Sequence, residues 1–209
     1  YIFKRSDNIH QLDQLDNFFK PKTFPHPTIY NNKDEEKFSS EKIISSNKYL
    51  VVSPGGNWNP KIWDACNFNK LLILLLRKYE NLNIVIVGSL IERQKYNDIL
   101  INNIDKDKII DITNKNITET FAVIKRCNLF IGNDSGLMHL STASKISTIG
   151  LFGPTNDKLY SPYGKNCYVI RTKESYDYFM SMSIDKSKSY MNSIKYEDVS
   201  RFIEQNNLL

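Results

Sequence analysis

The sequence predicts an α/β fold, a Rossmann-like parallel sheet with helices on both faces. From Tyr49 onward, short apolar runs alternate with longer segments of helical periodicity, which is the order of βαβ units. The runs are almost continuously apolar, as strands buried on both faces are. At 209 residues and 41% hydrophobic content, the chain is long enough to bury one substantial core.

The first 46 residues differ in texture from the rest, and we interpret them as a connector from an upstream or missing N-terminal domain. Residues 7–20 have the pattern of an amphipathic helix, which three prolines within residues 21–27 interrupt. Residues 31–37 form a charged run that we expect to be solvated. The predicted domain therefore covers residues 47–209 and includes the last helix.

The elements of this domain alternate along the chain. The predicted strands are 49–53, 83–87, 109–112, 129–132, 148–152 and 167–170. The predicted helices are 67–79, 92–102, 117–126, 137–144 and a last one that begins near Tyr196. Residues 173–190 are rich in Ser, Lys and Tyr, so we expect a loop there. The last helix has Glu197 and Asp198 in its first turn, where negative charge is favourable.

Composition excludes several functional classes. Cys66, Cys127 and Cys167 include no CxxC pair, so neither a disulfide framework nor a zinc site is indicated, and a reducing compartment fits best. The three histidines lie in different segments, so we predict no metal site. The net charge of +5 is dispersed, whereas nucleic-acid binding calls for a denser basic stripe. The longest apolar run, Leu71–Leu76, is too short to span a bilayer.

The loop after the first strand is the first candidate for chemistry, because ligands of open parallel sheets bind beyond the carboxyl ends of the strands. Gly55 and Gly56 let the backbone approach a ligand closely, and Lys61 supplies a mobile charge suited to phosphate. The alternative for this loop alone is a flexible turn with a surface lysine. Neither the Walker A spacing nor GxGxxG is present, so neither an ATPase P-loop nor the usual dinucleotide site is supported.

Two later turns carry carboxylates at the same edge. Glu92 follows the second strand, where it can accept two hydrogen bonds from a ribose diol or simply complement the dipole of its helix. Asp134 follows the fourth strand, where an ordinary N-cap is the alternative. Gly136 in the next helical turn costs up to about 1 kcal/mol against Ala, which is easier to understand if a ligand comes close. His139 and Thr155 have ordinary alternatives, a core imidazole and a plain turn.

Taken together, these turns resemble a known family. Residues 133–139, NDSGLMH, followed by LFGPT at 151–155, resemble the signature of glycosyltransferase family 9, the lipopolysaccharide heptosyltransferases. Pro54-Gly55-Gly56 with Lys61, and the turn from Gly88 to Glu92, are similar to two further loops of that family. The resemblance covers roughly residues 45–209 and implies the C-terminal, donor-binding half of a GT-B glycosyltransferase.

The resemblance assigns roles to residues of this chain. Glu92 would bind the ribose, Lys61 and the amides of 135–137 the diphosphate, and Asp134 the hydroxyls of the donor sugar. His139 and Thr155 match family positions without an assigned role. The catalytic candidates are Asp134 and Lys61, and the donor-binding candidates are Gly55, Gly56, Asn57, Glu92, Ser135, Gly136, Leu137, His139 and Thr155.

The resemblance also implies a reaction, which is inverting, metal-independent transfer of a heptose-like sugar from an ADP-linked donor to a lipopolysaccharide core or related bacterial glycan. It implies no cofactor besides that donor, a lipid-linked or oligosaccharide acceptor, and a cytoplasmic setting with peripheral contact at the inner membrane. The general base would come from an N-terminal acceptor domain in the same or another chain. Two alternatives stay open, a non-catalytic nucleotide-binding module and a transferase that uses another nucleotide sugar.

Two departures from the family pattern bear on specificity. Gly56 and Asn57 stand where some members have hydroxyl residues, which leaves the phosphate contacts of that loop open. Residues 174–188 replace the Cys-rich segment of many members, so the choice of acceptor or donor differs if that segment contributes to it.

Overall fold

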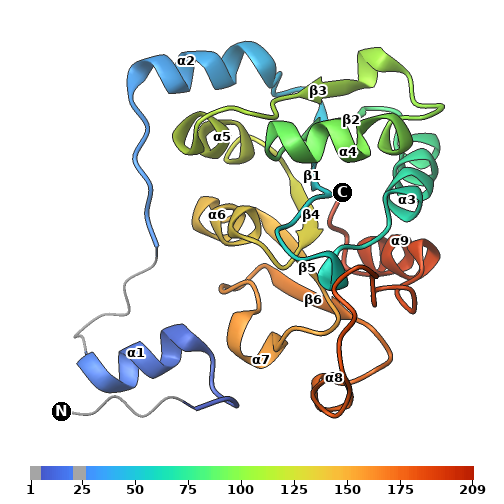
Figure 1. Ribbon diagram of the computed structural model, residues 1–209. Coiled ribbons are helices and arrows are strands. Elements are labelled where there is room, and N and C mark those ends of the chain that lie inside the picture. The colour runs from blue at the N-terminus through green and yellow to red at the C-terminus, as the bar shows by residue number, and fades with distance from the viewer. Residues whose placement is uncertain (1–5, 21–26) are drawn as a thin grey trace.

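The computed structural model describes residues 6–20 and 27–209. Six parallel strands form one sheet in the order β3-β2-β1-β4-β5-β6 (Figure 1). The strands are β1 (Lys48–Ser53), β2 (Leu82–Ile86), β3 (Ile109–Asp111), β4 (Leu129–Asn133), β5 (Ser147–Phe152) and β6 (Cys167–Arg171). All six predicted strands are confirmed to within one or two residues at each end. The strand order reverses between β1 and β4, and this switch point is where such sheets bind ligands.

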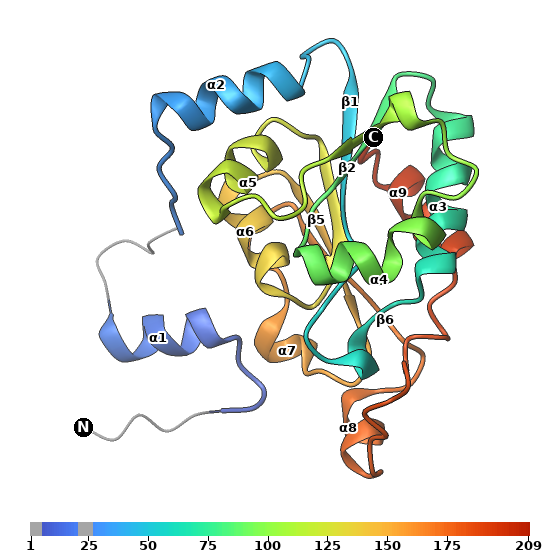
Figure 2. The ribbon, with the colours of Figure 1, turned by 45° about the horizontal axis from the view of Figure 1, so that its top comes forward.

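Helices cover both faces of the sheet (Figures 1 and 2). The helices are α1 (Gln11–Phe19), α2 (Lys33–Lys42), α3 (Ala65–Lys78), α4 (Leu90–Leu100), α5 (Ile117–Ile124), α6 (Gly136–Ser144), α7 (Asp157–Tyr160), α8 (Tyr176–Met180) and α9 (Tyr196–Gln205), with short 3-10 turns at η1 (Asn59–Lys61) and η2 (Lys106–Lys108). Side chains from α3, α4 and α9 form the core on one face, and those from α5 and α6 form the core on the other.

Strand β1 shows how the two cores share one sheet. Leu50 and Val52 belong to the α3 and α9 core, whereas Tyr49 and Val51 belong to the α5 and α6 core. Alternate residues of a strand point to opposite faces, so a strand covered on both faces is apolar at every position. This is why β1 showed no polar alternation in the sequence and why it occupies the centre of the sheet.

Residues 31–37 are solvated as expected, since none of them is buried, but most of them also begin α2, a helix that the sequence analysis did not predict. Asn32 and Glu35 form a capping box, in which the Asn32 side chain accepts from the Glu35 amide and Glu35 accepts from the Asn32 amide. Such reciprocal caps satisfy amides that otherwise lack acceptors at a helix start. The spacing is visible in the sequence, but a short polar helix also needs a surface to pack on.

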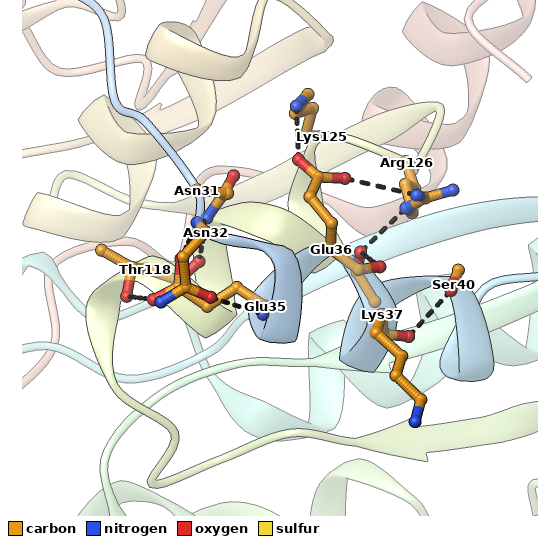
Figure 3. A network of polar contacts seen from close by, with 10 residues as sticks. Asn31, Asn32, Glu35, Glu36, Lys37, Ser40, Thr118, Lys125 and Arg126 are labelled. Atoms are coloured by element: carbon orange, nitrogen blue, oxygen red, sulfur yellow. Dashed lines mark hydrogen bonds and ion pairs between the residues drawn. The ribbon is translucent and has the colours of Figure 1, made fainter.

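That surface is α5 (Figure 3). Thr118, at the start of α5, donates its hydroxyl hydrogen to Glu35 of α2. Glu36 of α2 pairs with Lys125 at 2.8 Å and with Arg126 at 3.3 Å. The hydrogen bond from Lys125 lowers the pKa of Glu36, so the carboxylate stays charged at neutral pH. Exposed pairs of this kind stabilise little one by one, but together they fix the docking position of α2.

One further segment differs from expectation in part, and another agrees with it. Residues 173–190 contain the short helix α8, which begins at an N-cap formed by Ser175, so the loop prediction was only partly right. Helix α1 lies within the amphipathic stretch predicted at 7–20. It contacts the segment after α7, where the Tyr163 hydroxyl donates to Asp13 at 2.9 Å. Within the described residues, no helix combines the length and apolarity needed to cross a bilayer.

Gly150 gives a test of how tightly the sheet and α6 pack. A Cβ at Gly150 would lie 2.5 Å from Met138 Sδ, 2.9 Å from the Phe152 ring and 3.2 Å from Pro162. We expect Gly150→Ala to lower the free energy of unfolding by about 1–3 kcal/mol in urea titrations. Gly136→Ala is the control, because a Cβ there meets nothing within 4 Å and Ala favours the helix. Equal effects of the two substitutions would contradict the packing described for β5.

Candidate functional site

A cavity of about 830 Å³ opens at the carboxyl ends of the central strands. It gathers the loops that follow β1, β2, β3, β4 and β5. Every predicted site residue except Gly55 lines this cavity, namely Lys61, Asp134, Gly56, Asn57, Glu92, Ser135, Gly136, Leu137, His139 and Thr155. Loops spread over a hundred positions of sequence therefore meet at one place because their strands are parallel neighbours.

Asn133 holds the first loop to the end of β4. Its side chain is fully buried, and Nδ2 donates to the carbonyl oxygens of Pro54 at 2.9 Å and Gly55 at 3.0 Å. Its Oδ1 accepts from the Trp63 amide at 2.9 Å. Both ends of the loop that carries Lys61 are thus bonded to one side chain. Sequence reasoning gave Asn133 no such role, although a polar residue closing an apolar strand was the signal available.

An ion pair lies in the cavity wall. Lys61 Nζ is 3.4 Å from Asp134 Oδ2, and the two side chains are only 14% and 10% exposed. Ser135 caps α6 instead of Asp134, since the Ser135 hydroxyl accepts from the Met138 amide at 3.4 Å. The N-cap alternative for Asp134 is therefore excluded, and its carboxylate is directed to Lys61. A cation and an anion side by side can hold two differently charged parts of one ligand.

The start of α6 supplies backbone donors. The amides of Gly136 and Leu137 have no acceptor among the residues that the structure describes, as expected for the first turn of a helix. Open space surrounds the position that a Gly136 side chain would occupy. Free amides at the positive end of a helix dipole attract anions, and the open space lets one approach. This geometry fits the predicted reason for a glycine here.

Glu92 lines the cavity from the first turn of α4. It forms a capping box with Ser89, whose amide donates to Glu92 Oε2 at 2.7 Å. One of the two Glu92 carboxylate oxygens therefore caps the helix, as the alternative interpretation of this residue expected. Gly55 reaches the site indirectly. A Cβ at Gly55 would lie 2.2 Å from Glu92 Oε1, so only a glycine leaves room for this carboxylate. Gly55 therefore shapes the wall of the site although it does not line it.

Thr155 and His139 complete the predicted set. Thr155 lines the cavity, and its hydroxyl is buried and has no hydrogen-bond partner in the described part of the chain. His139 stands at the cavity wall, where desolvation lowers its pKa and the nearby Asp134 carboxylate opposes that shift in part. Lys61 and His10 add small effects that also lower the pKa of His139. At neutral pH the imidazole is therefore uncharged.

The loop after β3 brings residues that sequence reasoning missed. Asn114 adopts a left-handed conformation with φ of 61°, and its amide donates to the Gly88 carbonyl at 2.9 Å. Lys115 lines the cavity, and its Nζ lies 5.0 Å from the centre of the Phe38 ring of α2. Nothing in the local pattern marked these two residues, because their place depends on β2 and α2. Helix α2 thus touches one wall of the site.

The charge available to a ligand comes from side chains and amides. Over residues 6–20 and 27–209, no three His, Cys, Asp or Glu side chains are grouped so that they could hold a metal ion. Lys61 and Lys115 both line the cavity, and Lys61 pairs with Asp134 next to the start of α6, where the free amides add partial positive charge. An arrangement of this kind can bind a diphosphate and stabilise charge that develops on it.

The lowered pKa of His139 predicts a pH effect on stability. Because its folded pKa lies below the ordinary value of 6.5, the unfolded chain takes up a proton first as the pH falls. This residue therefore lowers the free energy of unfolding as the pH drops through that value. We expect His139→Gln to reduce the loss of stability between pH 7 and pH 5, measured by urea titration. An unchanged pH profile in the variant would contradict the lowered pKa.

The chain matches the family model described as glycosyltransferase family 9 (heptosyltransferase) over residues 6–187. It is 35% identical over 132 residues to lipooligosaccharide heptosyltransferase 2 of Campylobacter jejuni, which covers 61% of this chain and 41% of that protein. It is 23% identical to lipopolysaccharide heptosyltransferase 1 of Campylobacter coli, over 91% of this chain and 57% of the relative. The chain thus spans about half the length of the curated relatives it matches.

Solved structures show the same fold. A family 9 glycosyl transferase of Veillonella parvula superposes with a TM-score of 0.80 at 23% identity, over 98% of this chain and 62% of that one. Escherichia coli heptosyltransferase WaaC with ADP superposes with a TM-score of 0.73 at 17% identity, over 99% of this chain and 59% of that one. These likenesses confirm the Rossmann-like α/β fold class predicted for one half of a GT-B glycosyltransferase. The match of the family model over most of the chain shows that it belongs to glycosyltransferase family 9.

Proposed function

We propose that this chain is the donor-binding part of a glycosyltransferase that transfers a heptose-like sugar from an ADP-linked donor to a lipopolysaccharide core or a related bacterial glycan. One observation carries the proposal. The Lys61–Asp134 pair, the free amides of α6 and Glu92 line one cavity at the switch point of the sheet. Membership of family 9 and the likeness to heptosyltransferases support the class of reaction.

The arrangement supports a division of the donor into three parts. Glu92 binds the ribose through the carboxylate oxygen that does not cap α4, and the Gly136 and Leu137 amides bind the diphosphate together with Lys61. Asp134 accepts hydrogen bonds from the donor sugar's hydroxyls. The cavity, at about 830 Å³, falls within the range of roughly 300–1,000 Å³ that small-molecule sites occupy.

The same groups account for transfer without a metal cofactor. As the glycosidic bond to the diphosphate breaks, negative charge grows on the leaving phosphate oxygen. Lys61 and the amides at the start of α6 stabilise that charge, because their donors are held in place in the cavity wall before the bond breaks. The acceptor hydroxyl attacks the opposite face of the sugar, which inverts its configuration.

The groups that activate the acceptor lie outside this site. We assign the general base, which removes the proton of the acceptor hydroxyl, to an acceptor domain in the same or another chain. Asp134 does not serve as that base, because it is paired with Lys61 beneath the donor. We further propose that the protein works at the cytoplasmic side, with peripheral contact at the inner membrane when its acceptor is lipid-linked.

Binding measurements with ADP and ADP-heptose test the assignment of the two charged residues. We expect Lys61→Ala to weaken both ligands by roughly tenfold or more, since a charge-assisted hydrogen bond is lost. Asp134→Asn should weaken ADP-heptose but not ADP, because only the former carries the sugar. Lys165→Ala is the matched control, as this exposed lysine lies just before β6 at the opposite end of the strands.

The outcomes of that titration separate the alternatives. Binding of ADP and ADP-heptose with the expected losses supports the proposal. Tight binding of another nucleoside diphosphate in place of ADP would mean a transferase with a different donor. Binding of ADP without any added affinity for the sugar would favour a non-catalytic nucleotide-binding module. Wild-type protein that binds none of a panel of nucleotide sugars would refute the proposed site.

Gly136 tests the role of the α6 amides separately. Its alanine variant adds a methyl group where the structure has open space beside the first turn of α6. We expect Gly136→Ala to leave thermal stability unchanged or slightly raised, and to weaken ADP binding because the methyl group obstructs the phosphate. Isothermal titration measures the affinity and calorimetry the stability. Unchanged ADP affinity in this stable variant would place the phosphate elsewhere.

A further inference from the structure

The turn that carries Lys61 is short and needs support from outside. Lys61 ends the 3-10 turn η1, which is closed by bonds from the Lys61 amide to Trp58 and from the Ile62 amide to Asn59. A single 3-10 turn next to two glycines does not hold its own shape in water. Asn133 anchors the loop only at Pro54, Gly55 and Trp63, so the turn itself lies between the anchored points.

The segment 186–194 supplies the missing support. The Tyr190 amide donates to the Pro60 carbonyl at 3.0 Å, and the Ser189 hydroxyl donates to the Ile62 carbonyl at 2.6 Å. Two consecutive residues thus hold the carbonyl groups of the residues immediately before and after Lys61. The contact is extended at both ends, where Asn59 Nδ2 donates to the Lys186 carbonyl at 3.3 Å and Trp63 Nε1 to the Ile194 carbonyl at 3.0 Å.

Ser189 is the side chain through which segment 186–194 holds the residue after Lys61. Its hydroxyl donates to Ile62 and accepts from the Met191 amide at 3.2 Å, so it bridges the segment and the turn. Alanine would remove both bonds, whereas threonine keeps the hydroxyl. The Tyr190 bond uses main-chain atoms, so substitutions of side chains do not delete it directly. Ser189 is therefore the point at which this support can be tested.

We propose that Ser189 is a positioning residue for Lys61, and that the segment 186–194 fixes the Lys61 ammonium where it meets the donor diphosphate. The diphosphate contact rests on the function proposed above. Lys61 has four rotatable side-chain bonds, so the place of its charge depends on where its backbone is held. The hydrogen bonds at Pro60 and Ile62 hold that backbone on both sides of Lys61. With its backbone held there, the Lys61 ammonium lies 3.4 Å from the Asp134 carboxylate.

Titration of the full chain with ADP and with adenosine tests the proposal. We expect Ser189→Ala to weaken ADP by roughly tenfold, the effect of losing one hydrogen bond that orders a charged contact, and to leave adenosine unchanged. Ser189→Thr should bind ADP as the wild type does. Ser193→Ala is the matched control, because its hydroxyl lies in the same segment but donates to Glu174 and not to the turn.

A double-mutant cycle shows whether Ser189 acts through Lys61. In a Lys61→Ala background, Ser189→Ala should cause no further loss of ADP affinity. Three results would overturn the proposal. They are an undiminished ADP affinity in Ser189→Ala, a loss of adenosine affinity equal to the loss of ADP affinity, or a full additional loss of ADP affinity when Ser189→Ala is added to Lys61→Ala. The first would show that the turn keeps its place without Ser189, and the other two that Ser189 acts on the fold and not on Lys61.

A readout without ligand keeps this test separate from the proposed function. The rate at which an acylating reagent modifies the Lys61 amine, followed by peptide mass spectrometry, reports how firmly Lys61 is held in its partly buried place. We expect Ser189→Ala to raise that rate by about threefold or more, as local opening becomes easier, and Ser193→Ala to leave it unchanged. An unchanged rate in Ser189→Ala would overturn the positioning role. Wild-type protein that binds no ADP would refute the proposed function, and the labelling rate would still decide the role of Ser189.

Discussion

The side chain of one buried residue, Asn133, connects the sheet to the loop on which the site depends. Its side-chain nitrogen donates to two carbonyl groups of the loop after β1, and its side-chain oxygen accepts from one backbone N–H of that loop, all within 3.0 Å. A buried amide is costly unless its donors and acceptor are paired, so these bonds are made together or not at all. Because β1 and β4 are neighbours, the bond network ties Lys61's loop directly to the strand that ends beside Asp134. The distance between the two charged residues follows from this connection.

Contacts within the protein position the groups of this site. Gly55 is pressed against Glu92, Ser135 caps α6, and segment 186–194 holds the turn of Lys61 from outside. Donors already aimed at a diphosphate need no reorganisation when charge develops on it, which is the physical advantage of such a site over flexible lysines. In the function proposed above, the cavity binds and polarises a donor.

The parts that could be predicted from sequence are those set by local pattern and by topology. The strands were predictable from their apolar runs, and the meeting of Lys61, Glu92 and Asp134 from the rule that parallel strands end at one edge. Helix α2 was not, because its polar residues are stabilised by partners at the end of α5 about ninety positions away. The indirect role of Gly55 and the bridging role of Ser189 were hidden for the same reason. Each depends on contacts between segments that are distant in sequence and have no periodicity of their own.

The central proposal is that a diphosphate binds between Lys61 and the start of α6. A crystal structure of this chain with ADP measures that most directly. We predict a phosphate within hydrogen-bond distance of the Gly136 and Leu137 amides and of Lys61 Nζ, with the ribose hydroxyls on Glu92. ADP held at another surface, or in the cavity with its phosphates turned away from α6 and Lys61, would contradict it.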